Sequence, residues 1–402
     1  MVDVVAQIEA DNRGREAERR QLKYRKMQAN PFVFLRGTCH LFYVRLPEMA
    51  LLQDAPLTWS CGDLHLENFG SYKGDNRQVY FDINDFDEAA LAPCTWDLVR
   101  FLTSVRLGMS DSDSDHQSGQ TEGNHLGLLF LQAYSRALAL GKARWVEKET
   151  AEGPVKVLLE GLAQRKRKNF LDSRTTLKGH HRRLRLDNGK ALPVTEEQRA
   201  SLQRFMQEFA GTQAKPDWFT VRDMARRVAG TGSLGVERFI ILVEGKGSPD
   251  GNYFLDLKQA VPSALALALT PRVTQPCWTS EAERVVHIQY RLQASSMAFL
   301  QSVTWEGGSY LLRGLQPSED RVVVPQGEAR QQACISLMQS CGEITAWAHL
   351  RGVARQGSAS ADDLVAWGER RDWQSELLAL SQHCAQQTIA DWRKFCQSTL
   401  AR

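Results

Sequence analysis

The sequence predicts an α+β protein with a mainly helical part and a smaller β-rich part. Long Ala- and Leu-rich stretches with helical character, Gln331–Arg351 and Asp362–Phe395, fill the C-terminal end. The middle of the chain instead carries Phe239–Val243 and Tyr253–Lys258, two apolar segments around a glycine-rich turn, which is typical of a β-hairpin. A chain of 402 residues can form two domains or one domain of two lobes. We expect a helical lobe at 1–215, a β-rich lobe at 216–325, and C-terminal helices at 326–402 that complete the helical lobe.

Composition excludes several classes of protein. The formal net charge of +3 is too small to indicate a nucleic-acid partner. None of the eight cysteines forms a Cys-x-x-Cys pair, so a zinc ribbon is not expected, and buried reduced thiols fit a cytoplasmic setting. The N-terminal segment is charged, and no apolar run approaches the roughly 18 residues that a membrane-spanning helix needs. We expect a cytoplasmic protein without a membrane or nucleic-acid partner; composition leaves the oligomeric state open.

The N-terminal part begins with two predicted helices. Val4–Met27 is charged with weak amphipathic spacing, and Phe32–Leu46 is apolar with Pro31 at its start. Arg36 lies inside the second helix. A structural ion pair and a contact with a phosphate or substrate are equally compatible with that position.

A strand, a loop and a second strand follow, and they concentrate acidic residues. We expect strands from Leu57 toward Asn68 and at Gln78–Ile83, and then a helix at Trp96–Leu107 whose Asp97 anchors the preceding loop. Buried carboxylates are costly unless they bind a cation or a proton. About thirty apolar-rich positions contain seven of them: Asp63, Glu67, Asp75, Asp82, Asp85, Asp87 and Glu88.

This stretch resembles a known pattern. Gly62-Asp63-Leu64-His65 with Asn68, and then Asp85-Phe86-Asp87, are similar to the catalytic and metal loops of protein kinases and, more closely, of the aminoglycoside and choline phosphotransferases. Cys61 stands where those enzymes have a leading His. Together with the upstream segment Pro31–Gly37, the chain also resembles an uncharacterised bacterial family grouped with the protein-kinase-like superfamily.

The resemblance implies a fold, a reaction and roles for residues. It implies a kinase-like two-lobed fold and transfer from ATP to an acceptor, a small-molecule hydroxyl in our expectation. Asp63 would orient the acceptor hydroxyl and take its proton, and His65 would order the loop or assist catalysis. Asn68 and Asp85 would hold Mg²⁺ on the ATP phosphates.

A second glycine-rich stretch fits the same reaction. Gly230-Thr231-Gly232-Ser233-Leu234-Gly235 is followed by strand-like residues rather than by the helix of a dinucleotide fingerprint. A glycine-rich loop between two strands covers the phosphates in kinases, and a lysine on the next strand contacts them. We therefore expect Gly230, Gly232, Ser233, Gly235 and Lys258 to bind ATP. A glutamate of the next helix, Glu283 in preference to Glu281, would hold the lysine.

The order of these two stretches is the reverse of the order in kinases. The glycine-rich loop and Lys258 follow the Asp63 loop instead of preceding it. The pattern therefore predicts a circularly permuted kinase-like fold, and the helix ending at Trp347–Arg351 would be the one that precedes the catalytic loop in kinases.

Three other functions stay open on the sequence. Nucleotidyl transfer needs the same ATP site, and the change at Cys61 is compatible with a non-catalytic nucleotide-binding protein. Asp63-Leu64-His65, Gly123-Asn124-His125 and Gly179-His180-His181 resemble in residue type, although not in spacing, a metallophosphoesterase. The basic stretch Arg165–Arg185 fits either a solvated face or contact with an anionic substrate.

Overall fold

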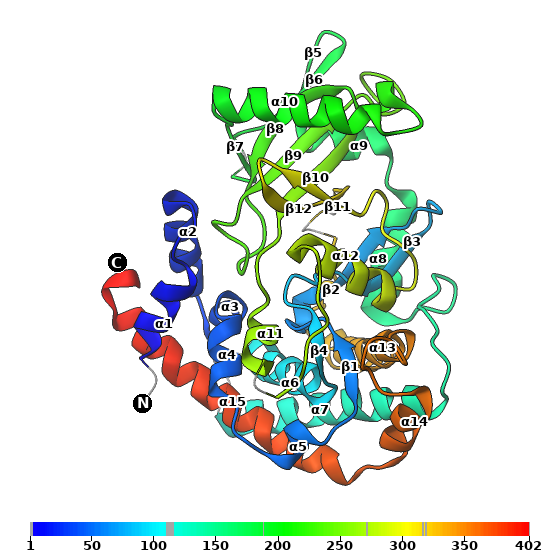
Figure 1. Ribbon diagram of the computed structural model, residues 1–402. Helices are drawn as coiled ribbons and strands as arrows, with labels where there is room; N and C mark the ends of the chain where they lie inside the picture. Colours follow the sequence, from blue (N-terminus) through cyan, green and yellow to red (C-terminus); the bar gives the residue numbers. More distant parts are fainter. Residues whose placement is uncertain are drawn as a thin grey trace.

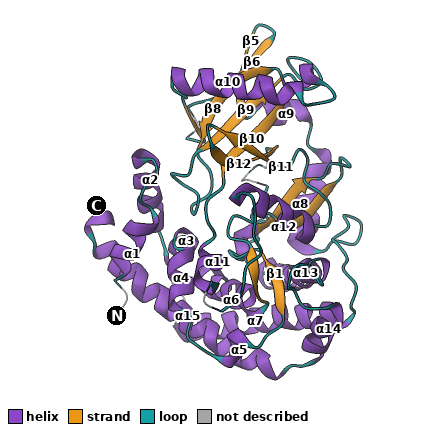
Figure 2. Cartoon of the chain, viewed as in Figure 1, coloured by secondary structure: helices purple, strands orange, loops and turns teal. Residues whose placement is uncertain are grey.

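The computed structural model describes residues 3–109, 116–187, 189–270, 272–315, 317 and 320–401. Its mixture of helices and strands confirms the predicted α+β class. Most strands lie at one end of the molecule beneath α10, and most long helices lie at the other end (Figures 1 and 2).

The main sheet has six strands in the order β11-β12-β10-β9-β8-β7, and all of its pairs are antiparallel. Strands β8, β9 and β10 are consecutive in sequence and adjacent in space, as the hairpin prediction requires. The strands are β7 (Ala191–Leu192), β8 (Val221–Arg227), β9 (Arg238–Val243), β10 (Tyr253–Gln259), β11 (Gln301–Trp305) and β12 (Gly308–Gly314).

The two faces of this sheet differ in chemistry because strand side chains alternate. Leu255 and Leu257 of β10 pack with Phe205 of α10 (Glu196–Gly211) in one apolar cluster. Asp256 and Lys258 alternate with these leucines and are buried as well. The sheet therefore buries charged groups on the face away from α10.

The helical end is built on long helices whose side chains form the largest core cluster. Helices α7 and α13 make the closest contact, and Gly342 of α13 faces the backbone of Phe130 and the side chain of Ala133. The helices are α6 (Thr95–Met109), α7 (His116–Ala139), α13 (Ala329–Arg351), α14 (Ala361–Glu369) and α15 (Asp372–Gln397).

The N-terminal helices pack against the last long helix. Val4, Ile8 and Met27 share a cluster with Phe395 of α15, so both ends of the described chain lie on one side of the molecule (Figure 1). The helices are α1 (Val4–Asp11), α2 (Ala17–Met27), α3 (Pro31–Gly37), α4 (Cys39–Arg45) and α5 (Ala50–Gln53).

The acidic stretch forms two small antiparallel pairs between the sheet and the helices. Strands β1 and β4 pair, as do β2 and β3. The strands are β1 (Leu57–Ser60), β2 (Phe69–Lys73), β3 (Val79–Ile83) and β4 (Ala90–Pro93).

The basic stretch forms helix and hairpin elements beside the sheet. Arg182 is buried and binds Asp172 and Asp250, so this arginine is structural. The elements of this region are α8 (Gly153–Gln164), α9 (Arg167–Asp172), β5 (Thr175–Lys178) and β6 (His181–Leu184). Two further helices follow β10 in the sequence, α11 (Ala264–Leu269) and α12 (Glu281–Leu292).

Several helices predicted as continuous are broken. Val4–Met27 divides into α1 and α2 around Gly14, which adopts φ +86°, a conformation that favours glycine. Phe32–Leu46 divides at Thr38 into α3 and α4, and Asp362–Phe395 divides into α14 and α15. The sheet end also includes α10 and β7, which precede residue 216, the start predicted for the β-rich lobe. None of the described helices is both long enough and apolar enough to cross a membrane.

Gly342→Ala should destabilise the protein by roughly 1–3 kcal/mol, because the added Cβ would collide with the backbone oxygen of Phe130. Chemical denaturation measures this change. The matched control is Gly161→Ala in the exposed part of α8, where a Cβ meets open space. There the better helix propensity should stabilise the protein by roughly 0.5–1 kcal/mol. Stabilisation by Gly342→Ala, as expected for the control, would contradict close packing of α7 against α13.

Candidate functional site

A cavity of about 140 Å³ lies between the main sheet, the acidic stretch and the N-terminal helices. The residues that line it come from segments far apart in the chain. Seven of the predicted site residues are among them: Asp63, His65, Asn68, Asp85, Gly230, Gly232 and Ser233.

The loop that carries Asp63 is anchored by hydrogen bonds to the side chain of Asp97 at the start of α6. The Asp97 carboxylate accepts the backbone N–H groups of Cys61 at 2.9 Å and Gly62 at 3.0 Å. Gly62 has φ +79°, and a Cβ there would collide with the carbonyl oxygen of Glu88. This loop conformation therefore needs glycine at position 62. The anchoring role predicted for Asp97 is present.

Asp63 presents one carboxylate oxygen to a buried cation and leaves the other oxygen toward the cavity. Arg100 of α6 donates to Oδ1 through Nε at 2.7 Å and also through its terminal nitrogen. Burial raises the pKa of Asp63, and Arg100 opposes that rise. Arg100 thus fixes the orientation of Asp63, and Oδ2 is the oxygen available to accept a proton.

His65 orders the loop. Its Nδ1 accepts the backbone N–H of Glu67 at 3.1 Å, which leaves Nε2 as the protonated nitrogen, 3.8 Å from Oδ2 of Asp63. Burial, followed by Arg36 and Arg100, holds the pKa of His65 well below its usual value. A neutral His65 therefore orders the loop beside Asp63 and does not itself act as an acid at neutral pH.

Asn68 ties the Asp63 loop to the Asp85 loop. Its side-chain nitrogen donates to the carbonyl oxygens of Asp63 and Asp85, both at 3.1 Å, and its oxygen accepts the N–H of Asp85 at 2.8 Å. The two predicted metal ligands are therefore adjacent. Strands β2 and β3 lie between them in the sequence, and the pairing of these strands brings the two residues together.

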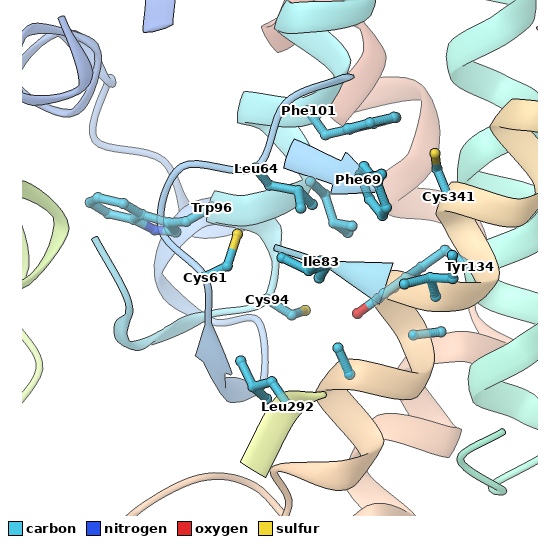
Figure 3. Packing of buried hydrophobic residues seen from close by; sticks show 14 of the residues in the cluster. Cys61, Leu64, Phe69, Ile83, Cys94, Trp96, Phe101, Tyr134, Leu292 and Cys341 are labelled. Carbon is cyan, nitrogen blue, oxygen red and sulfur yellow. The ribbon is translucent and has the colours of Figure 1, made fainter. Parts of the chain in front are cut away.

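Cys61 faces the core instead of the cavity. It belongs to the large apolar cluster with Leu64 and Ile83, which Figure 3 shows beside it. Burial raises the pKa of its thiol well above the usual value. Cys61 thus occupies a packing position.

Lys258 bridges the sheet and the acidic stretch. Its Nζ binds Oδ2 of Asp87 and lies 3.5 Å from Oδ1 of Asp85. Burial would raise the pKa of Asp85, but Lys258, with Arg313 and Arg238, lowers it to about 2. Asp85 is therefore a carboxylate throughout the physiological pH range.

Glu283 does not reach Lys258, so its predicted role is corrected. Its carboxylate accepts the backbone N–H of Thr279 at 2.6 Å at the start of α12. The next residue, Arg284, points inward and donates to the backbone oxygens of Asp87 and Ala89 at 2.8 and 2.6 Å. Helix α12 therefore holds the acidic loop through arginine, and Asp87 takes the place expected for a glutamate beside the lysine.

The glycine-rich loop joins β8 to β9, as predicted, and Gly230, Gly232 and Ser233 line the cavity. Gly235 lies elsewhere: its carbonyl accepts the N–H of Glu16 at 3.1 Å, and a Cβ there would press on Arg15. Gly235 thus contacts the N-terminal segment and is not part of the described cavity wall.

Three arginines that the sequence reasoning missed also line the cavity: Arg227, Arg238 and Arg313. All three bind the buried carboxylate of Asp256, at 2.9, 2.6 and 3.4 Å. One carboxylate cannot balance three guanidinium groups, so this wall has an excess of positive charge. Charged residues within apolar strands, such as Asp256 between Leu255 and Leu257, were the signal for this cluster.

A second cavity of about 200 Å³ adjoins the first and shares Pro317 and Asp320 with it. Its wall combines aromatic side chains, among them Tyr72, Phe170 and Phe254, with the basic side chains of Lys73 and Arg165–Arg167. The second cavity is thus richer in aromatic side chains than the first, and basic side chains line it as well.

The chemistry of the site fits a magnesium ion that is shared with phosphates. Asp85 is ionised with its side chain 48% exposed, and the oxygen of Asn68 accepts the backbone N–H of Asp85. Mg²⁺ in proteins is commonly held by one or two such oxygens together with substrate phosphates. Among the described residues, no group of three or more His, Cys, Asp or Glu side chains could hold a metal alone.

The chain belongs to a bacterial family described as "Uncharacterized protein conserved in bacteria (DUF2252)", whose model matches residues 15–398. This confirms the expected bacterial family. No curated protein matches the chain, and no solved structure matches it either.

Glu88→Gln should change how stability depends on pH. Glu88 accepts the N–H of Ala264 at 2.5 Å, and burial raises its pKa to about 7, above its unfolded value near 4.5. The wild type then loses stability as pH rises from 4.5 to 7, because the folded state must release a proton that it holds more tightly.

The Gln variant keeps the hydrogen-bond acceptor and lacks the proton. Relative to wild type it should gain roughly 1–3 kcal/mol between pH 4.5 and 8 in denaturation experiments. Glu160→Gln on the exposed face of α8 is the control. Parallel pH profiles for Glu88→Gln and wild type would show that the Glu88 pKa is not raised.

Proposed function

We propose that this family member is an ATP- and Mg²⁺-dependent phosphotransferase that acts on a small hydroxyl acceptor. The observation that carries the proposal is the meeting of Asp63, Asn68 and Asp85 with the glycine-rich loop at one cavity, beside Lys258. Lys258 and Asp87 are 171 positions apart in the sequence and form an ion pair.

The charged cavity suits a polyphosphate. Backbone N–H groups of a glycine-rich loop can approach phosphate oxygens closely, and Gly230 and Gly232 supply such a loop. Lys258 and the arginine wall supply positive charge on the sheet side. Asn68 and Asp85 would hold Mg²⁺ against the same phosphates.

The adjoining second cavity suits the base of the nucleotide. Tyr72 and Phe254 offer aromatic surface, and Leu315 adds an aliphatic wall. Ligand sites are commonly apolar with a few polar groups that fix orientation. A nucleotide would place its base here and its phosphates in the charged cavity, because the two cavities adjoin.

The proposed step transfers the terminal phosphoryl group. The acceptor oxygen attacks the γ-phosphorus, the bond from that phosphorus to the bridging oxygen breaks, and ADP leaves. Oδ2 of Asp63 accepts the acceptor proton, since Oδ1 is bound to Arg100. The elevated pKa of Asp63 makes it a better base than an exposed aspartate.

The N-terminal helices support a small acceptor. They contribute Asp11, Lys23 and His40 to the cavity wall, so the space near Asp63 is bounded by polar side chains. Burial, followed by the nearby Arg15, lowers the pKa of Lys23 to about 7. Such a wall fits a compact polar molecule better than an extended protein segment.

The element order supports a permuted kinase-like fold. The glycine-rich loop joins β8 and β9, and Lys258 lies on the next strand, which is the relation seen in protein kinases. The chain after α13 runs beside β1, where the N–H of Ala359 donates to Leu57 at 2.8 Å. The helix that would precede the catalytic loop in a kinase is thus followed by a segment beside β1, the strand that leads into that loop, despite its late position in the sequence.

The metallophosphoesterase alternative gains no support from this arrangement. His125 lies on α7, whereas His180 lies at the β5–β6 turn, and these elements are at opposite ends of Figure 1. Nucleotidyl transfer would use the same residues as phosphoryl transfer, so the position of a transferred label decides between these two reactions.

Saturating ATP with Mg²⁺ should stabilise the wild type, by about 2.7 kcal/mol at 100 times the dissociation constant. Asp85→Asn should lose the Mg²⁺-dependent part of this effect, because it removes the ionised ligand. Asp63→Asn should keep binding and slow phosphoryl transfer by about 10²–10⁴-fold. Thermal unfolding and transfer from γ- or α-labelled ATP measure these effects.

Asp217→Asn at an exposed position is the matched control and should behave as wild type. Label from the γ-position identifies a phosphotransferase, and label from the α-position identifies a nucleotidyl transferase instead. Binding without any transfer would favour the non-catalytic alternative. The absence of both stabilisation and transfer in the wild type would overturn the proposal.

A further inference from the structure

Arg36 lies at the C-terminal end of α3, where three parts of the cavity wall meet. It lines the cavity together with Asp63, Asp85 and Gly232. The proposed phosphotransferase mechanism gives roles to these three residues but none to Arg36, which is only 8% exposed. A buried arginine in a cavity must be satisfied by ion pairs and hydrogen bonds, or its burial is costly.

The hydrogen bonds of Arg36 are incomplete. One terminal nitrogen lies 2.6 Å from a carboxylate oxygen of Glu67. Nε is buried and has no hydrogen-bond partner in the part of the chain that the structure describes. The guanidinium also lies 5.6 Å from the ring centre of Phe32, which restrains its orientation. The side chain is therefore fixed in place with an unused donor.

Glu67 does not neutralise Arg36 by itself, because the same carboxylate also binds Arg321. Two guanidinium groups share one carboxylate, and an excess positive charge remains at this point of the wall. Arg36 lines the same cavity as Asp63 and Asp85, the residues of the two acidic loops. The excess charge lies where the proposed transfer would occur.

The glycine-rich loop touches α3 at this residue. A Cβ added to Gly232 would lie 3.0 Å from the backbone oxygen of Arg36, a tighter contact than side chains normally make. The glycine allows the loop to lie against the end of α3. The loop expected to cover the phosphates thus lies directly beside the Arg36 backbone.

We propose that Arg36 binds the terminal phosphoryl group of a nucleoside triphosphate and gives the site its preference for triphosphate over diphosphate. This inference rests on the proposed function. An arginine suits the task because its planar fork can donate two hydrogen bonds to phosphate oxygens. Nε and a terminal nitrogen form one such fork, and Nε is the donor left unused.

The competing role is purely structural. Arg36 would then only hold Glu67 and the turn that carries Asn68, and losing it would weaken all nucleotide binding equally. Arg321 separates the two roles, because it binds the same carboxylate of Glu67 from a more exposed position, with its side chain 33% exposed. A structural role through Glu67 predicts similar effects for both arginines.

The test measures the affinities of Mg²⁺-ADP and of the Mg²⁺ complex of a non-hydrolysable ATP analogue by calorimetry. Wild type should prefer the triphosphate analogue. Arg36→Gln should reduce the ratio of the two affinities by about 10- to 100-fold, the effect of losing one or two charge-assisted hydrogen bonds. Its affinity for ADP should stay within about threefold of wild type.

Arg321→Gln should keep the wild-type ratio, and Arg36→Lys should show an intermediate ratio because a lysine retains the charge and loses the fork. If Arg36→Gln does not fold, Arg36→Lys decides the question. Equal weakening of both nucleotides by the Arg36 and Arg321 variants would overturn the role of Arg36 and leave the proposed function standing. Failure of the wild type to bind either nucleotide would overturn both.

Discussion

The Asp97 carboxylate accepts the N–H groups of Cys61 and Gly62, and the geometry of the whole site depends on these two hydrogen bonds. Both groups are buried, and an unsatisfied buried donor costs about 1–3 kcal/mol. The bonds join the Asp63 loop to α6, which also supplies Arg100 to Asp63. One helix therefore sets both the position of the loop and the direction of its carboxylate.

The two walls of the cavity are held together by complementary charge. On the sheet side, the three arginines around Asp256 line the cavity, and the buried Lys258 pairs with Asp85 and Asp87 of the opposite wall. A lysine at this position fixes the distance between the sheet and the acidic loops, because its removal would leave two neighbouring carboxylates unpaired.

The parts of the site that the sequence could predict are those with strong local constraints. Asp63, Asn68 and Asp85 lie in short segments whose glycine and strand neighbours fix their spacing, and all three line one cavity. Glu283 was assigned to hold Lys258, but Arg284 is the residue of α12 that contacts the acidic loop, because the face of a short helix depends on a rotation that one residue changes. The arginines around Asp256 come from three strands, and only pairing of those strands brings them together.

The N-terminal helices and the segment between them contact the glycine-rich loop, although they are far from it in the sequence. Arg15 donates to the carbonyl oxygens of Gly232 and Leu234 at 2.5 and 3.0 Å, and the end of α3 contacts the same loop. A segment that begins the chain thereby supports a loop that lies more than half-way along it. Since that segment also packs on α15, the ends of the chain brace the glycine-rich loop from the helical side. The N-terminal segment thus adds a second support for the loop, which in a simple β-hairpin would be held only by its two strands.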